Sequence, residues 1–212
     1  MKNMGEKINF SVLQWGPCIV HMKIPSDVQG LLLAEGEASK EDAKPALAGV
    51  LDKEVFFRDK NKFNKFFETT FSLYNYAVGT WKKRKGGEKA PDSKYFLEKL
   101  WCNFQRPHDF NPPHSHGGAL SFVIYLRIPE ELKNENKAFK GLSSGPGGIT
   151  FLYGDSEDYS ICHHSFFPEE KDMFIFPAWV KHWVYPYKSD CTRISVSGNV
   201  IDSMKLNQMK KK

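Results

Sequence analysis

The chain has 212 residues, of which 41% are hydrophobic, 14% aromatic and 26% charged, a composition typical of a soluble globular protein and unlike that of a disordered one. It contains no apolar run of the roughly 18–20 residues that span a bilayer, and its first nine residues lack the apolar stretch of a secretory signal. We therefore expect neither a membrane-spanning nor a secreted protein.

The net charge of +5 is unevenly placed along the sequence. Much of the basic excess lies in residues 82–85 and in the lysines at 205 and 210–212. We interpret these segments as a solvated loop and a terminal tail, and we do not expect nucleic acid as a partner.

The four cysteines, Cys18, Cys102, Cys162 and Cys191, are widely spaced and form no Cys-x-x-Cys pair. This spacing argues against a disulfide framework or a zinc ribbon and in favour of reduced thiols. It predicts a cytoplasmic location.

The first 95 residues are predicted to be mainly helical after an opening pair of strands. Residues 9–14 and 18–24 have strand-like patterns, and residues 28–33 are predicted to form a short helix. The clearest helix covers residues 60–81, where aromatic side chains recur at helical spacing. We expect this stripe to pack on a sheet, and we expect residues 82–91 to form a loop. The stripe consists of Phe63, Phe66, Phe67, Phe71, Tyr74 and Trp81.

From residue 95 onward the pattern changes to short apolar runs separated by Pro and Gly, which predicts strands. Such closely spaced strands, with no helices alternating between them, indicate an antiparallel sandwich or barrel. The predicted fold is therefore mainly β with N-terminal helices (α+β). The predicted strands cover residues 100–105, 120–128, 148–153, 172–176, 179–185 and 192–200.

Three histidines suggest a metal site. His114 and His116 lie two residues apart in an extended segment, so their side chains are expected on one face. His182 lies among apolar residues on a later predicted strand. Imidazole groups suit iron and zinc, but single buried histidines are often hydrogen-bonded core residues. The spacing alone leaves both interpretations open.

Arg193 adds a second signal, since it shares one face of a predicted strand with Ser195 and Ser197. A permanently charged side chain that faces inward needs an anion, and a guanidinium with a nearby hydroxyl suits a carboxylate. The alternative is a structural ion pair, for which Asp190 is the nearest acidic residue.

Taken together, the order His-x-His, then Phe-Pro-x-Trp-x-x-His, then Arg-x-Ser resembles the 2-oxoglutarate/Fe(II) dioxygenase superfamily. Residues 111–126 and 176–199 resemble, more narrowly, a family of small 2-oxoglutarate/Fe(II) oxygenases of marine bacteria and their phages. The resemblance covers about residues 100–200. It implies a double-stranded β-helix, a cupin-like jelly roll, in a single domain of residues 1–212. Within it, residues 1–95 would be a helical support region, 96–200 the core and 201–212 a basic tail.

The resemblance also implies roles for individual residues. His114 matches the first metal ligand and His182 the distal histidine, while Arg193 matches the residue that grips the far carboxylate of 2-oxoglutarate. His116 departs from the superfamily pattern, which has Asp or Glu there. Further cosubstrate contacts would come from Ser195 and Tyr125. Loop carboxylates that could replace His116 as the third ligand are Asp109, Asp155 and Glu157.

The implied activity is oxygenation, usually hydroxylation, with Fe(II), 2-oxoglutarate and O₂ as cofactor and cosubstrates. Two alternatives stay open: a three-histidine cupin-type metalloenzyme that does not use 2-oxoglutarate, and a non-catalytic jelly-roll binding module. The primary substrate and the oligomeric state are not predicted, and a homodimer is one option.

Overall fold

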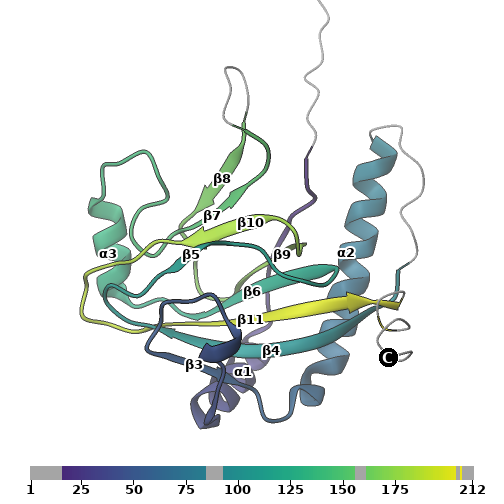
Figure 1. Ribbon diagram of the computed structural model, residues 1–212, viewed down its shortest axis with the longest axis horizontal. Helices are drawn as coiled ribbons and strands as arrows, with labels where there is room; N and C mark the ends of the chain where they lie inside the picture. The colour runs from purple at the N-terminus through teal and green to yellow at the C-terminus, as the bar shows by residue number, and fades with distance from the viewer. Residues whose placement is uncertain (1–15, 85–92, 156–160, 204–205, 207–212) are drawn as a thin grey trace, which may run out of the picture.

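The polypeptide folds into two antiparallel β-sheets that face each other (Figure 1). The computed structural model describes residues 16–84, 93–155, 161–203 and 206. The larger, seven-stranded sheet has the order β1-β9-β6-β11-β4-β3-β2. Its strands are β1 (Val20–Lys23), β2 (Glu41–Asp42), β3 (Lys53–Phe56), β4 (Tyr95–Gln105), β6 (Leu120–Arg127), β9 (Asp172–Pro177) and β11 (Arg193–Asp202).

The smaller, four-stranded sheet has the order β5-β10-β7-β8. Most strands that lie side by side in a sheet are not consecutive in the sequence, since the backbone passes repeatedly from one sheet to the other. This pattern confirms the prediction of a mainly β protein with an antiparallel sandwich. The strands of the smaller sheet are β5 (Asn111–His114), β7 (Ile149–Leu152), β8 (His163–Phe166) and β10 (Lys181–Val184).

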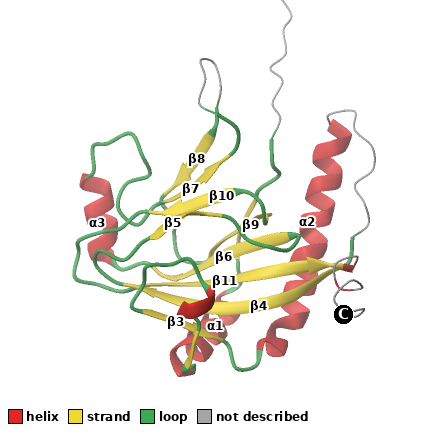
Figure 2. Ribbon diagram, viewed as in Figure 1, coloured by secondary structure: helices red, strands yellow, loops and turns green. Residues whose placement is uncertain are grey.

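Two helices, α1 (Ser26–Ala38) and α2 (Asn64–Arg84), pack on the outer face of the larger sheet. The aromatic stripe, as far as Tyr74, forms this contact as predicted, and the rings of Phe67 and Phe122 have centroids 4.8 Å apart. A third helix, α3 (Glu130–Ala138), lies on the far side of the molecule from α2 (Figure 2). Two short 3-10 helices, η1 (Lys44–Ala46) and η2 (Lys60–Phe63), complete the elements.

Several boundaries differ from those predicted. The long helix starts with η2 and continues to Arg84, so the first residues of the predicted loop 82–91 are helical. The rest of that loop, residues 85–91, lies outside the described residues, as does the predicted strand 9–14. The strands β2, β3, β5 and β8 and the helix α3 were not predicted. Of these, β2 and β3 come from the first 95 residues and extend the larger sheet.

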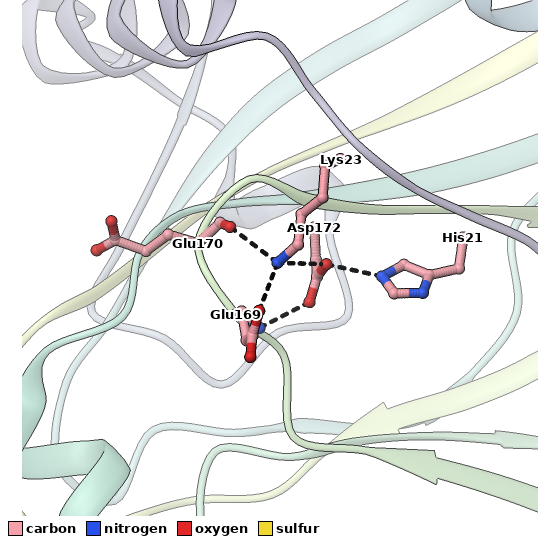
Figure 3. Close-up of polar contacts among 5 residues, drawn as sticks. All are labelled: His21, Lys23, Glu169, Glu170 and Asp172. Atoms are coloured by element: carbon pink, nitrogen blue, oxygen red, sulfur yellow. Dashed lines mark hydrogen bonds and ion pairs between the residues drawn. The ribbon is translucent and has the colours of Figure 1, made fainter.

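A polar network fixes β1 at the edge of the larger sheet (Figure 3). The buried carboxylate of Asp172 lies 2.7 Å from His21 Nε2 and 2.9 Å from Lys23 Nζ, and it accepts a hydrogen bond from the Glu169 amide at 2.7 Å. Although burial opposes ionisation, these partners hold the pKa of Asp172 below its usual value. The strand is therefore held by charge-assisted bonds as well as by its backbone ladder.

The cysteines are free thiols. Within the described ranges, no helix is long and apolar enough to cross a membrane.

Candidate functional site

Three histidine side chains meet between the two sheets. His114 on β5 and His182 on β10 are directly opposite each other in the strand register. His116 follows just after β5, where its backbone amide donates to the carbonyl of Ala178 at 2.8 Å. Each histidine contributes one ring nitrogen, and these three nitrogen atoms all lie within 4.8 Å of one another. Such a cluster has the geometry of a site for one metal ion.

Backbone carbonyls orient two of these rings. His114 Nδ1 lies 2.7 Å from the carbonyl of Pro112, and His182 Nδ1 lies 3.0 Å from the carbonyl of Val180. A carbonyl only accepts, so each Nδ1 carries the proton and each Nε2 keeps its lone pair for a ligand. Second partners of this kind are typical of metal-binding histidines.

The environment also keeps the three imidazoles neutral. Burial, with a smaller effect of His114, lowers the pKa of His182 to about 3 and that of His116 to about 4. Burial lowers the pKa of His114 as well. Because a metal binds the neutral imidazole, the cluster is ready to coordinate a cation at neutral pH.

Two of the three loop carboxylates considered from the sequence, those of Asp109 and Asp155, do not join this cluster. The carboxylate of Asp109 accepts a hydrogen bond from the Arg106 amide at 2.9 Å, and Asp155 is exposed. Glu157 lies outside the described residues. In the part of the protein that the structure describes, the group that could hold a metal ion therefore consists of imidazoles alone.

A polar cavity, which we call the inner cavity, runs from the histidines into the space between the sheets. One row of side chains across the larger sheet lines it, because Ser195 on β11 pairs with Asn103 on β4 and with Tyr125 on β6. Asn103 Nδ2 donates to Ser195 Oγ at 3.3 Å and to Ser197 Oγ at 3.1 Å. The hydroxyl proton of Ser195 stays available to a ligand in the cavity.

Arg193 lies in the same inner cavity and is only 2% exposed. Its Nη1 donates to the carbonyl of Gly147 at 2.6 Å, and its guanidinium lies 5.2 Å from the centre of the Tyr125 ring. No ion pair involves Arg193 within the described ranges, so the structural pair with Asp190 is not formed there. A buried cation without a counter-ion is costly, so an anionic ligand at this end of the cavity would be stabilised.

Two buried polar atoms at this end of the cavity have no hydrogen-bond partner among the described residues. They are Nε of the Arg193 guanidinium and the hydroxyl oxygen of Tyr125. Burial raises the pKa of the Tyr125 phenol to about 12, so it keeps its proton and can donate. These orphaned donors and the histidine cluster fit a metal ion with a bound carboxylate-bearing cosubstrate. The six residues to which the resemblance assigns a metal or cosubstrate contact all line this one cavity: His114, His116, Tyr125, His182, Arg193 and Ser195.

Sequence reasoning missed two supports of the site. Asn103 could have been found, since Trp101, Asn103 and Gln105 alternate with apolar residues along one strand. Tyr187 gives no such signal, yet its hydroxyl is buried, donates to the carbonyl of Gln105 at 2.5 Å and accepts from the Arg193 amide at 3.2 Å. It therefore fixes the start of β11 and with it the backbone of the arginine.

A third missed residue is Glu54 on β3, which pairs in register with Asn103 and extends the polar row. Glu54 is 2% exposed, and its Oε2 has no partner among the described residues. Burial, helped by the negative charges of Asp109 and Asp42, raises the pKa of Glu54 to about 7.

Comparisons with known proteins point to the same kind of protein as the site. Residues 99–199 match the profile of a family described as "Putative 2OG-Fe(II) oxygenase", a range that contains the six site residues predicted from the sequence. No curated protein sequence matches this one.

Solved structures share the fold at low sequence identity. The viral collagen prolyl hydroxylase of Paramecium Bursaria Chlorella virus-1, in complex with 2-oxoglutarate, has a TM-score of 0.51 and 14% identity, with 86% of the present sequence and 94% of the viral one covered. A prolyl hydroxylase of Trichoplax adhaerens, in complex with a hypoxia inducible factor peptide, has a TM-score of 0.51 and 10% identity, with 91% and 86% covered. The fold is therefore a double-stranded β-helix, as expected.

A Burkholderia pseudomallei oxidoreductase of the 2OG-Fe(II) oxygenase family matches at a TM-score of 0.38 and 14% identity, over 53% of the present sequence. The match spans about half of the Burkholderia protein, 47% of its length. The family match and the fold lead to one conclusion. Residues 99–199 are similar to the 2OG-Fe(II) oxygenases, a family whose name refers to 2-oxoglutarate and iron(II).

Proposed function

We propose that the protein hydroxylates its substrate, with iron(II) held by His114, His116 and His182. We further propose that Arg193 binds the distal carboxylate of 2-oxoglutarate, with hydrogen bonds from Ser195 and Tyr125. The observation that carries this assignment is the buried guanidinium of Arg193, which has no counter-ion among the described residues and shares one cavity with the histidine cluster. A dicarboxylate that reaches from the metal to Arg193 would satisfy both ends of this cavity.

The bound iron and 2-oxoglutarate supply the oxidation of a C–H bond by dioxygen, coupled to the conversion of 2-oxoglutarate to succinate and CO₂. The protein's own residues position these groups. The neutral imidazoles offer three nitrogen ligands and leave the other coordination positions open. Arg193 can form two parallel hydrogen bonds to a carboxylate, which fixes its orientation as well as its position.

Apolar side chains shield the His182 side of the cluster from water. The ring of Phe176 has its centroid 4.8 Å from that of His182, and the centroid of the Phe151 ring lies 6.0 Å from it. Both rings are buried. A dry surrounding strengthens the electrostatic contacts inside the cavity and limits side reactions of an oxidant.

The first experiment measures metal content and succinate formation from 2-oxoglutarate under air. We expect iron(II)-dependent succinate formation, reduced in the Arg193→Lys variant. The all-imidazole donor set also suits a cupin-type enzyme that does not use 2-oxoglutarate. That alternative predicts metal binding with neither binding of 2-oxoglutarate nor succinate formation.

Location and partners belong to the same proposal. The four free thiols support a cytoplasmic location. For double-stranded DNA we expect only non-specific affinity, on the order of 10⁻⁴–10⁻⁶ M at physiological salt.

A further inference from the structure

A second cavity opens beside the histidine cluster, and we call it the outer cavity. It has a volume of about 360 Å³, and its walls come from residues 46–48, from β4 and from β11. His114 and His116 line both the inner and the outer cavity, and the two cavities share no other lining residue among those described. The proposed metal ligands therefore lie at the junction between an anion site and a more open space.

A β-bulge brings two opposite charges to the wall of the outer cavity. In the ladder between β4 and β11, Lys99 pairs with Asn199 and Leu97 pairs with Val200, so Glu98 has no partner on β11. Successive residues of a regular strand face opposite sides, but a bulge re-aims the extra residue. Glu98 and Lys99 thus both line the outer cavity. The ammonium of Lys60 donates to the carbonyl of Glu98 and holds the bulge in place.

Neither of these charged side chains has an ion-pair or hydrogen-bond partner in the described part of the protein. The side chains of Glu98 and Lys99 take part in none of the ion pairs or hydrogen bonds found among the described residues. The nearby Asn199 Oδ1 accepts from Ser121 at 3.4 Å, which leaves the amide NH₂ group of Asn199 free to donate. The wall offers an anion, a cation and an amide donor to a ligand.

The remaining lining limits the kind of ligand. Apart from the histidines, no aromatic ring of the described residues lines the outer cavity, so it offers no stacking platform for a nucleobase or a flat apolar ring. Ala46 and Ala48 provide small walls. A volume near the lower end of the roughly 300–1,000 Å³ of ligand pockets suits a small molecule.

We propose that the outer cavity binds the substrate that is oxidised and that this substrate is a small zwitterion with the chemistry of an α-amino acid. Its ammonium group pairs with Glu98, its carboxylate pairs with Lys99, and its side group extends toward His114 and His116. The inference rests on the proposed function. One oxygen atom of O₂ enters a C–H bond of this side group to give C–OH, and the other enters succinate as 2-oxoglutarate loses CO₂. The substrate and 2-oxoglutarate each give up two electrons, and O₂ takes up four.

The test is a binding measurement without turnover. The protein is loaded with zinc(II) and 2-oxoglutarate, and each of the twenty proteinogenic L-amino acids is titrated by calorimetry. For the tightest ligand, its N-acetyl derivative and its primary amide are then compared. We expect at least one free amino acid to bind and both derivatives to bind at least tenfold more weakly. If no free amino acid binds, or if either derivative binds equally well, the inference is wrong.

Two charge-removing variants assign the groups. Glu98→Gln should abolish the preference for the free amine over the N-acetyl form, and Lys99→Met should abolish the preference for the carboxylate over the amide. Glu41→Gln and Lys40→Met serve as matched controls, since both residues are exposed and do not line the outer cavity. Unchanged selectivity in Glu98→Gln or Lys99→Met would overturn the assignment.

The same titrations separate this inference from the proposed function. If 2-oxoglutarate binds and succinate is formed but no amino acid binds, only the zwitterion inference fails. If 2-oxoglutarate does not bind to the metal-loaded protein, the proposed function and the inference both fail.

Discussion

The rings of His114 and His182 lie with their centroids 4.3 Å apart because the two residues are directly opposite on β5 and β10. Both donate through Nδ1 to a backbone carbonyl two residues earlier in the sequence. The smaller sheet therefore presents two pre-oriented Nε2 atoms at one point. The turn after β5 adds His116, whose ring centroid is 4.9 Å from that of His114 and 5.1 Å from that of His182.

The first prediction concerns metal binding. His114→Ala, His116→Ala and His182→Ala should each lose iron(II) while the protein stays folded, since each change removes one of three ligands. Metal content after dialysis measures this loss, with circular dichroism as the check on folding. Asp109→Ala is the control and should keep the wild-type content. Retention of iron by His116→Ala together with its loss in Asp109→Ala would show that the three-histidine assignment is wrong.

The second prediction concerns stability and pH. The pKa of Glu54 is raised to about 7 in the folded protein, so the folded state holds the proton more tightly than the unfolded state, whose pKa is near 4.5. The contribution of protonated Glu54 to the free energy of unfolding is therefore fully present below about pH 4.5. It is lost as the pH rises through about 7. The total loss is about 3 kcal/mol at ~1.4 kcal/mol per pH unit.

Urea unfolding between pH 5 and pH 8.5 measures this effect. Glu54→Gln keeps the shape without the charge and should flatten the decline over this range. Glu41→Gln, an exposed change on the neighbouring strand β2, should keep the wild-type slope. An identical pH profile for Glu54→Gln and the wild type would contradict the prediction.

The third prediction concerns the turn between His116 and β6. Gly118 has a φ of +105°, and a Cβ placed there would lie 2.7 Å from the carbonyl oxygen of Val200. Gly118→Ala should destabilise the protein by about 1–3 kcal/mol and weaken iron(II) binding, since the strain lies two residues from His116. Denaturant unfolding and metal content measure both effects.

Gly30→Ala is the matched control for this change. Gly30 lies inside α1, and a Cβ there meets nothing within 4 Å. Because alanine is the better helix former, this variant should be more stable than the wild type by about 0.5–1 kcal/mol. A neutral effect of Gly118→Ala would mean that the turn does not constrain the site.

The elements predicted from sequence were those with strong local patterns. The run from Leu120 to Leu126 and the aromatic stripe on α2 are long enough to specify a strand and a helix on their own. The strand β5 is different, since it contains Pro112 and Pro113 and looks like a loop. It forms because His114 pairs with His182 on β10, and no local signal encodes that pairing.

The same limit applies to the site. The spacing of His114 and His116 and the charge of Arg193 mark these residues in the sequence. Their meeting in one cavity depends on strand register, which brings Ser195 opposite both Asn103 and Tyr125. The bulge that re-aims Glu98 depends on a one-residue mismatch between two strands, and sequence periodicity cannot specify it.

The most direct test is a titration of 2-oxoglutarate into the iron(II)-loaded protein without oxygen, followed by the metal-to-ligand charge-transfer absorbance. Arg193→Lys keeps the charge but loses the two-pronged hydrogen bond. We expect saturable binding to the wild type and an apparent dissociation constant raised roughly tenfold or more in the variant, at ~1.4 kcal/mol per decade. Metal content should stay near normal in the variant. Unchanged binding in Arg193→Lys, or no binding of 2-oxoglutarate to the wild type, would contradict the account.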